Sequence, residues 1–432
     1  MDSYVTILMV LGVMTVLQGV SQRLKVSSTM LLIIVGLAFG FVPSMSSLQV
    51  QPEIIFLLFL PPLLFEATFN ISFKDFRDNL DTIGALAFGL VFITTAGIAV
   101  IAHYMIPGMT WPVAFVLGST LAATDAVAAI SITRNLGMTK LASTILESES
   151  LINDASALVA YQFAVAAVAG TEFIWWNAIL KFLVLIGGAI GVGAVIFVLL
   201  RFFLRLVWSQ HLALLSLILI LPFVTYLVAE EVHVSGVIAV VALGFGFTRL
   251  SDKVFPADLK QASKTIWNIV VFLLNGLIFI LIGIEFPLVL KSIDQHLWLP
   301  YIGYAFIITV VALIIRSVRV VLQRRKLLMV FHNPRYQNGK RRVSQSMLLT
   351  FQDGVIISWS GMRGIVSLAM AISLPVTLAN GEPFPMRNEI IFITTAVVLF
   401  TILGQGLLLP IIVKRIRKEN NASAESEAHV NQ

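Results

Sequence analysis

The chain has 432 residues, of which 58% are hydrophobic and 12% are charged, and its mean hydropathy is +0.94. A soluble domain carries about a quarter charged residues, so this composition excludes an ordinary soluble protein and requires lipid as the solvent for most of its surface. The absence of cysteine excludes disulfides and thiolate metal sites, and the six histidines lack metal-ligand spacing. The formal net charge of +6 is better explained by membrane topology than by a polyanionic partner, and we expect no nucleic-acid partner.

The apolar residues form long continuous runs rather than the alternating pattern of a β-barrel, so we expect an all-α polytopic membrane protein. A spanning helix needs about 20 mostly apolar residues. The first run is interpreted as a span rather than a cleavable signal peptide, because no basic segment precedes it. Thirteen spans are predicted, near residues 4–21, 28–42, 53–70, 81–103, 111–133, 141–170, 176–205, 211–229, 233–248, 265–286, 300–322, 350–375 and 388–413.

The distribution of lysine and arginine predicts the orientation of these spans. With an outside N-terminus and a cytoplasmic C-terminus, 25 of the 29 basic residues fall on the inner side and three on the outer side. The inner total includes the stretch from Arg316 to Arg342, and Arg363 alone is left within a span. We therefore expect a membrane domain over residues 1–419, no soluble domain, and a short polar cytoplasmic tail over residues 420–432.

Two predicted spans are interrupted by polar residues and glycines. The fifth carries Thr124 and Asp125 near mid-membrane, and the twelfth carries Arg363 within the segment 358–364. If spans 1–6 and 8–13 form two six-helix repeats, both breaks lie in the fifth span of a repeat, and the repeats are inverted. Paired breaks of this kind indicate a transporter site at the repeat interface. Ordinary packing glycines are the alternative, but they do not account for Asp125 or Arg363.

The sixth span begins with the cluster Glu147-Ser-Glu-Ser-Leu-Ile-Asn-Asp154. Helical spacing places Ser150 four residues before Asp154, and Glu149 four residues before Asn153, along one side of the helix. Ionised groups at membrane depth are costly and normally face a functional cavity. Glu147 and Glu149 have an alternative interpretation as interfacial acids at the cytoplasmic end of the span.

These side chains suit a small hard cation, which prefers oxygen ligands. Asp154 supplies a charge, Ser150 a hydroxyl, and Thr124 a hydroxyl or a carbonyl at the break; Asn153 offers an amide. Because burial favours the protonated carboxyl, a proton and a cation would compete for Asp154. That competition is sufficient for exchange if the empty charged site cannot cross the membrane.

Arg363 requires a buried anionic partner if it lies at membrane depth. Glu66 in the third span is the first candidate, and Asp125 is the second. Asn153 is a further acceptor for the same guanidinium.

At these residues the sequence resembles the monovalent cation:proton antiporter-1 family, the NhaP/NHE-type exchangers. Four motifs carry the resemblance, in family order and across the whole membrane region: residues 59–66 (FLPPLLFE), 123–128 (ATDAVA), 147–154 (ESESLIND) and 358–364 (SWSGMRG). One departure is Ala126, because many members have proline after the aspartate of the fifth span.

The resemblance implies an NhaA/NhaP-like fold of thirteen spans with inverted repeats, a homodimer and an elevator-like core motion. It implies that Asp154 carries the exchanged ion, with Ser150, Glu149, Thr124 and Asp125 completing the cation site. Sodium would be held at Asp154, Ser150 and Thr124.

The resemblance further implies that Asn153, Arg363 and Glu66 hold the site in shape, with Glu66 paired to Arg363. The Asn153-Asp154 pair resembles the electroneutral branch, which exchanges one proton for one cation. No cofactor is implied beyond the transported Na⁺ and H⁺.

The expected function is exchange of Na⁺ or Li⁺ for H⁺ in pH and sodium homeostasis, in a bacterial inner membrane. A K⁺/H⁺ antiporter of the same fold is the main alternative. A channel would need a continuous polar pore, whereas the polar residues cluster at one depth. An intramembrane enzyme is disfavoured because no Ser/His pair, zinc motif or aspartyl-protease signature is present, and the acids argue against an anionic substrate.

Overall fold

A computed structural model describes residues 3–24, 28–42, 52–126, 129–130, 138–170, 175–207, 210–291, 293–332, 345–378 and 380–416. Apart from an isolated bridge between Thr377 and Pro383, the ordered elements in these ranges are all helical. Helices lie in each of the thirteen predicted ranges. Seven of the described helices are long and apolar enough to cross a membrane, while the full number of crossings stays a prediction.

The first half of the chain forms helices up to the one that carries the charged cluster. Their bounds are α1 Ser3–Leu24, α2 Ser28–Gly40, α3 Pro52–Asn70, α4 Phe73–Asp78, α5 Leu80–Gly84, the π-helix η1 Ala85–Leu90, α6 Val91–Met105, α7 Trp111–Thr120 and α9 Lys140–Val168.

The second half contains the longest helices and a second interrupted one. Their bounds are α10 Trp175–Val207, α11 His211–Glu231, α12 Gly236–Val254, α13 Ala257–Lys291, α14 Gln295–His332, the short 3₁₀ turn η2 Gln345–Met347, α16 Phe351–Trp359, α17 Ile365–Ile372, α18 Arg387–Leu399 and the π-helix η3 Phe400–Gln405.

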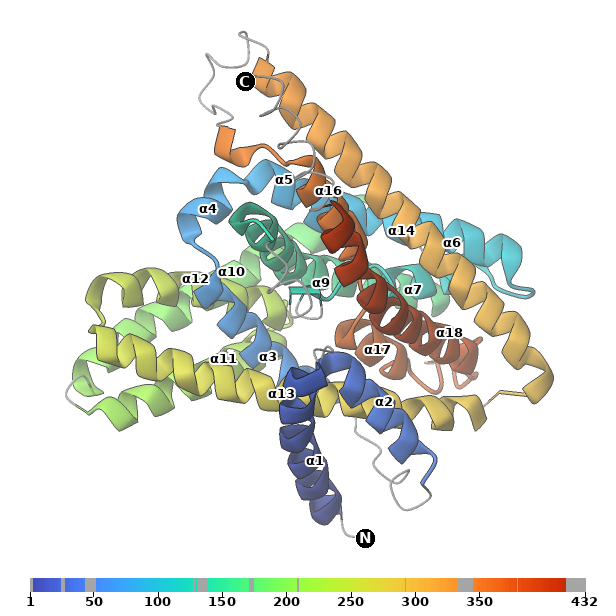
Figure 1. The fold of residues 1–432 in the computed structure, drawn as a ribbon, viewed down its shortest axis with the longest axis horizontal. Helices are drawn as coiled ribbons and strands as arrows, with labels where there is room; N and C mark the ends of the chain where they lie inside the picture. Colours follow the sequence, from blue (N-terminus) through green and yellow to red (C-terminus); the bar gives the residue numbers. More distant parts are fainter. Residues whose placement is uncertain are drawn as a thin grey trace, which may run out of the picture.

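The helices separate into two groups (Figure 1). One group, which we call the site bundle, contains α5–α7, α9, α14 and α16–α18, with α9 near its centre. The other, the scaffold, contains α1–α3 and α10–α13, and its helix α13 runs along the boundary from the side of α11 to the side of α2. Apart from Glu66 on α3, the candidate residues therefore lie on the site bundle, against a mostly apolar neighbouring wall.

Within the scaffold, α2 and α13 approach backbone to backbone. A Cβ on Gly36 would lie 2.9 Å from Ile280 Cα, and one on Gly283 would lie 2.5 Å from the carbonyl oxygen of Ile33. Small residues at such crossings let membrane helices pack closely. This close contact holds α13 in a fixed position against α2.

Within the site bundle, the starts of α9 and α16 are joined by one acid. Asp353, 1% exposed, closes a capping box with Thr350 at the start of α16. Its other oxygen accepts a 2.5 Å hydrogen bond from Thr139, the N-cap of α9. Because the two helix starts share this carboxylate, α9 and the interrupted helix α16–α17 are positioned together.

Candidate functional site

Two interrupted helices cross at their breaks. α7 ends at Thr120 and is followed by non-helical backbone to Asp125, while residues 360–364 separate α16 from α17. The Asp125 amide donates a 2.7 Å hydrogen bond to the Met362 carbonyl. Each interruption therefore satisfies part of the backbone that the other exposes, as membrane depth requires.

Arg363 holds this crossing through carbonyl groups. Its Nε donates to the Leu121 carbonyl at 3.0 Å, its Nη1 donates to the Gly361 carbonyl, and its amide donates to Thr401 Oγ1 at 3.0 Å. Thr401 belongs to the π-helix η3, and such irregular turns are frequent at functional sites. The side chain is 2% exposed, so Arg363 is a buried brace between three segments.

The expected ion pair between Glu66 and Arg363 is not among the contacts of the described residues. The guanidinium of Arg363 is directed to carbonyls instead, because the two breaks leave helix-terminal carbonyls without intrahelical partners at this position. Glu66 is half-buried on α3 and does not line the cavity described below.

Helix α9 is attached to the first break by two side chains. Ser150 Oγ donates to the Thr124 carbonyl at 3.0 Å and accepts from the Ala126 amide at 3.3 Å. Asn153 Nδ2 donates to Thr124 Oγ1 at 2.5 Å. The predicted juxtaposition of Thr124, Ser150 and Asn153 is therefore seen, and it fixes the break against the helix that carries Asp154.

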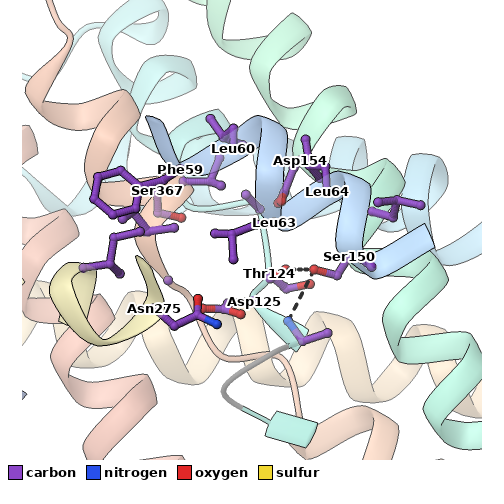
Figure 2. Close-up of a pocket in the computed structure, with 18 of the residues that line it drawn as sticks. Phe59, Leu60, Leu63, Leu64, Thr124, Asp125, Ser150, Asp154, Asn275 and Ser367 are labelled. Atoms are coloured by element: carbon purple, nitrogen blue, oxygen red, sulfur yellow. Dashed lines mark hydrogen bonds between the residues drawn. The ribbon is translucent and has the colours of Figure 1, made fainter. Parts of the chain in front are cut away.

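A cavity of about 90 Å³ lies between the site bundle and the scaffold. Thr124, Asp125, Ser150 and Asp154 all line it, as Figure 2 shows. Its opposite wall is mostly apolar and is formed by α3 and α13, with Phe59, Leu60, Leu63, Leu64, Ile278 and Phe279. This volume has room for a few water molecules or for a partly hydrated small ion.

Asp154 differs from the other buried acids in its surroundings. Among the described residues, no hydrogen bond or basic side chain engages its carboxylate, whereas Asp353 and Glu149 are each engaged by side-chain partners. A carboxylate at membrane depth without a permanent partner is suited to binding a proton or a mobile cation.

Glu149 lies elsewhere. Its two oxygens accept hydrogen bonds from Arg316 at 2.5 and 2.8 Å, and Arg316 Nε donates to the Ile357 carbonyl at 2.8 Å. Both side chains are almost completely buried, and neither lines the cavity. The expectation that Glu149 completes the cation site is therefore not what this geometry favours, because its oxygens are occupied by a guanidinium.

Arg316 was missed by the charge count, which assigned it to the inner loop. The structure places it inside α14, 1% exposed. The sequence did contain a signal, since Arg316 falls within the predicted span 300–322, where an arginine implies a buried acid.

Three further polar residues line the cavity without having been predicted to do so. Glu147, for which an interfacial position was equally open, lines it and accepts a 3.1 Å hydrogen bond from Ser143. Asn275 on α13 and Ser367 on α17 also line it. Asn275 could have been singled out from the sequence, because it is the one polar residue in the apolar run 269–284. A single serine such as Ser367 gives no comparable signal.

The family is established by comparison with known sequences. A model of the family described as "Sodium/hydrogen exchanger, transmembrane" matches residues 7–415. The chain belongs to this family. It is accordingly a multi-pass membrane protein of a transporter family and not an enzyme, as the sequence predicted.

Relatives in this exchanger family are similar across most of the chain. A sodium, potassium, lithium and rubidium/H⁺ antiporter of Bacillus pumilus is 37% identical over 89% of this chain and 57% of its own length. The Na⁺/H⁺ antiporter ApNhaP of Aphanothece halophytica is 33% identical over 94% of this chain and 73% of its own length. The chain thus spans somewhat more than half the length of the Bacillus pumilus relative.

The fold is shared with a solved structure. The sodium proton antiporter MjNhaP1 from Methanocaldococcus jannaschii, solved at pH 8, superposes with a TM-score of 0.67 at 18% identity, covering 94% of this chain and 96% of that one. The NhaP-type fold expected from the sequence is thereby supported.

Proposed function

We propose that this protein is a secondary antiporter that exchanges Na⁺ or Li⁺ for H⁺, one for one, at a single site centred on Asp154. The observation that carries the proposal is the Asp154 carboxylate in a cavity at the crossing of two interrupted helices, with no permanent partner among the described residues. A proton or a cation, never both, neutralises that charge. Since either form moves one positive charge per carboxylate, the exchange is electroneutral.

The cation is held by oxygens from two segments, helix α9 and the break that follows α7. Asp154 supplies the charge and Ser150 supplies a hydroxyl. Thr124 supplies its backbone or side-chain oxygen at the break, and Asp125 faces the same cavity. Asn153 and Arg363 keep these ligands in place through their bonds to Thr124 and Leu121. Glu149 acts with Arg316 as a structural pair that fastens α9 to α14.

Transport follows by alternating access, in which the site bundle, which takes helices from both proposed inverted six-helix repeats, moves against the scaffold. A single-site exchanger needs the empty, charged site to stay on its side of the membrane, and the apolar wall of α3 and α13 opposes its passage. We further propose a homodimer in a bacterial cytoplasmic membrane, with the N-terminus outside, serving pH and sodium homeostasis.

Potassium exchange on the same site is the second candidate, because one relative is named for sodium, potassium, lithium and rubidium. Hydroxyl, carboxylate and carbonyl oxygens bind all of these ions, so ligand type alone does not decide between them.

The test is proton flux in proteoliposomes containing the purified full chain and a trapped pH indicator. Na⁺, Li⁺ and K⁺ are added in turn, and Na⁺ or Li⁺ should dissipate an imposed pH gradient. Clamping the membrane potential with valinomycin and K⁺ should leave the rate with Na⁺ unchanged. Flux that requires charge compensation would contradict electroneutral exchange, and no cation-dependent flux would contradict antiport.

A further inference from the structure

The cavity has a second polar wall that the proposed chemistry does not use. Ser367 on α17 and Asn275 on α13 both line it, and in Figure 2 they lie on the side away from Ser150, with Asn275 beside Asp125. Asn275 comes from the scaffold, whereas Asp154, Ser150 and Thr124 come from the site bundle. The cavity is therefore polar on both sides of the boundary between the two helix groups.

Ser367 has a hydroxyl with no role in the fold. It is 0% exposed, and its Oγ has no hydrogen-bond partner within the described part of the chain. An unsatisfied buried hydroxyl costs roughly 1–3 kcal/mol. A ligand or a water molecule in the adjoining cavity would supply the missing hydrogen bond or coordination contact and so account for this hydroxyl.

Asn275 is the one polar lining residue that α13 contributes among otherwise apolar ones, Ile278 and Phe279. Its side chain extends toward Asp125 in Figure 2. An amide in a membrane helix normally bonds to a neighbouring helix, yet no hydrogen bond of this side chain appears among the described residues. Its amide oxygen is therefore available to the contents of the cavity.

Asp125 lies between these groups and the start of α17. A Cβ added to Gly364, the N-cap of α17, would lie only 2.6 Å from Asp125 Cβ and 2.8 Å from its Cγ. The carboxylate is thus seated against a helix N-terminus, where negative charge is stabilised. Ser367, three residues after Gly364, faces the cavity from the first turn of the same helix.

We propose that Ser367 and Asn275, next to Asp125, form a second coordination wall for the transported monovalent cation, opposite the α9 side chains Asp154 and Ser150. This inference rests on the antiport function proposed above and adds two neutral residues, Ser367 and Asn275, that set cation affinity and selectivity without titrating. The cation, with its remaining waters, lies between the two walls. Because Asn275 belongs to the scaffold, this part of the shell is lost when the site bundle moves away.

The two neutral ligands should matter more for Na⁺ than for K⁺. A smaller ion holds its hydration shell more strongly, so it depends more on protein oxygens to replace the waters it loses. Removing an oxygen therefore weakens sodium binding more than potassium binding, and lowers the selectivity between them.

The experiment measures KM and kcat for Na⁺, Li⁺ and K⁺ in proteoliposomes of the full chain, for Asn275→Ala and Ser367→Ala. We expect the KM for Na⁺ to rise on the order of tenfold, as loss of one oxygen ligand worth about 1.4 kcal/mol would give, with kcat within about twofold. The KM for K⁺ should rise less. Sodium-dependent thermal stabilisation of the purified variants should weaken in parallel.

Ser360→Ala is the matched control. Ser360 lies at the same break, is 1% exposed and also has an Oγ without a partner among the described residues, but it does not line the cavity. Its substitution should leave every KM at the wild-type value.

Conservative variants keep the test decisive if an alanine variant is not recovered as folded protein. Asn275→Asp retains an oxygen and should keep the KM for Na⁺ at or below the wild-type value, whereas Ser367→Cys supplies a soft sulfur and should raise it. Wild-type KM values in folded Asn275→Ala and Ser367→Ala would overturn the second wall while leaving antiport intact. A wild-type protein with no cation-dependent proton flux would overturn both.

Discussion

Four buried charged side chains of the site bundle have structural roles that Asp154 does not share. Asp353 caps two helices, Arg363 braces the crossing through carbonyls, and Glu149 and Arg316 neutralise each other. Asp154 faces the cavity instead. The contrast separates the acids that hold the structure from the acid that is available for exchange.

Breaking the Glu149–Arg316 ion pair should destabilise the folded protein. Glu149→Gln strands a buried guanidinium, and breaking a buried pair in this way costs about 3–5 kcal/mol. We expect a clearly lower melting temperature of the purified protein and a lower folded yield. Asp252→Asn, which breaks the exposed contact between Asp252 and Lys260 at 3.6 Å, is the control and should change the melting temperature little.

A double variant separates the structural role from ion binding. Glu149→Gln combined with Arg316→Met removes both charges and should recover part of the lost stability. If Glu149→Gln alone keeps the wild-type melting temperature but raises the KM for Na⁺, the glutamate is an ion ligand after all, as the sequence resemblance implied.

The pH dependence of transport follows from competition at Asp154. Protons occupy the carboxylate as pH falls, so the apparent KM for Na⁺ should rise toward low pH and fall as pH increases. The rate at saturating Na⁺ should instead decline at high pH, where protons become scarce. A KM for Na⁺ that does not change with pH would contradict a shared site; initial rates over a pH series measure it.

At the scale of elements, the geometry of the site depends on two helices that stop and cross. One backbone hydrogen bond, from the Asp125 amide to the Met362 carbonyl, joins the two breaks, and Gly364 allows Asp125 to lie directly against the start of α17. The π-helix η3 contributes by presenting Thr401 to the Arg363 amide. Ala126, where many relatives have proline, is bonded through its amide to Ser150, a contact that proline does not permit.

Gly364→Ala should disrupt this crossing. The new methyl group would lie 2.6 Å from the Cβ of Asp125, an atom that can move away only if the backbone of the break shifts. We expect exchange to fall by at least tenfold even in protein that inserts and purifies normally. Gly354→Ala in α16 is the matched control, because its Cβ would meet only side-chain atoms at 3.8 Å or more; equal activity of the two variants would contradict the role of the crossing.

The helical elements and the interruptions were largely predictable from the sequence. Continuous apolar runs locate the helices, and polar residues beside glycines mark both breaks. The partners of the buried charges could not be predicted. Glu149 and Arg316 lie 167 positions apart, so the sequence around either residue gives no signal of their contact. The burial of Asp353 gives no local signal either, since it depends on Thr139 from another helix.

At the scale of the whole molecule, the cavity lies at the boundary between the site bundle and the scaffold. The tight contact of α2 with α13 keeps one side firm, while the shared Asp353 cap keeps α9 and α16 together on the other. Relative movement of the two groups would carry the α9 ligands past the apolar wall.

The proposed orientation can be tested directly, because the chain contains no cysteine. Lys253 and Lys291 are both exposed and lie near opposite ends of α13, which is about 50 Å long at 1.5 Å per residue. Lys253→Cys should react with a membrane-impermeant maleimide in everted vesicles, and Lys291→Cys only in right-side-out preparations. The reverse labelling pattern would invert the topology without affecting the chemistry of the site.

The central claim is that Asp154 carries either the proton or the cation. Uptake of ²²Na⁺ into proteoliposomes under an imposed pH gradient tests it, with Asp154→Asn compared with wild type and with the cavity-remote variant Ser360→Ala. The account predicts that Asp154→Asn folds and inserts like wild type but shows no uptake above empty liposomes, while Ser360→Ala transports normally. Uptake by folded Asp154→Asn at the wild-type rate would contradict it.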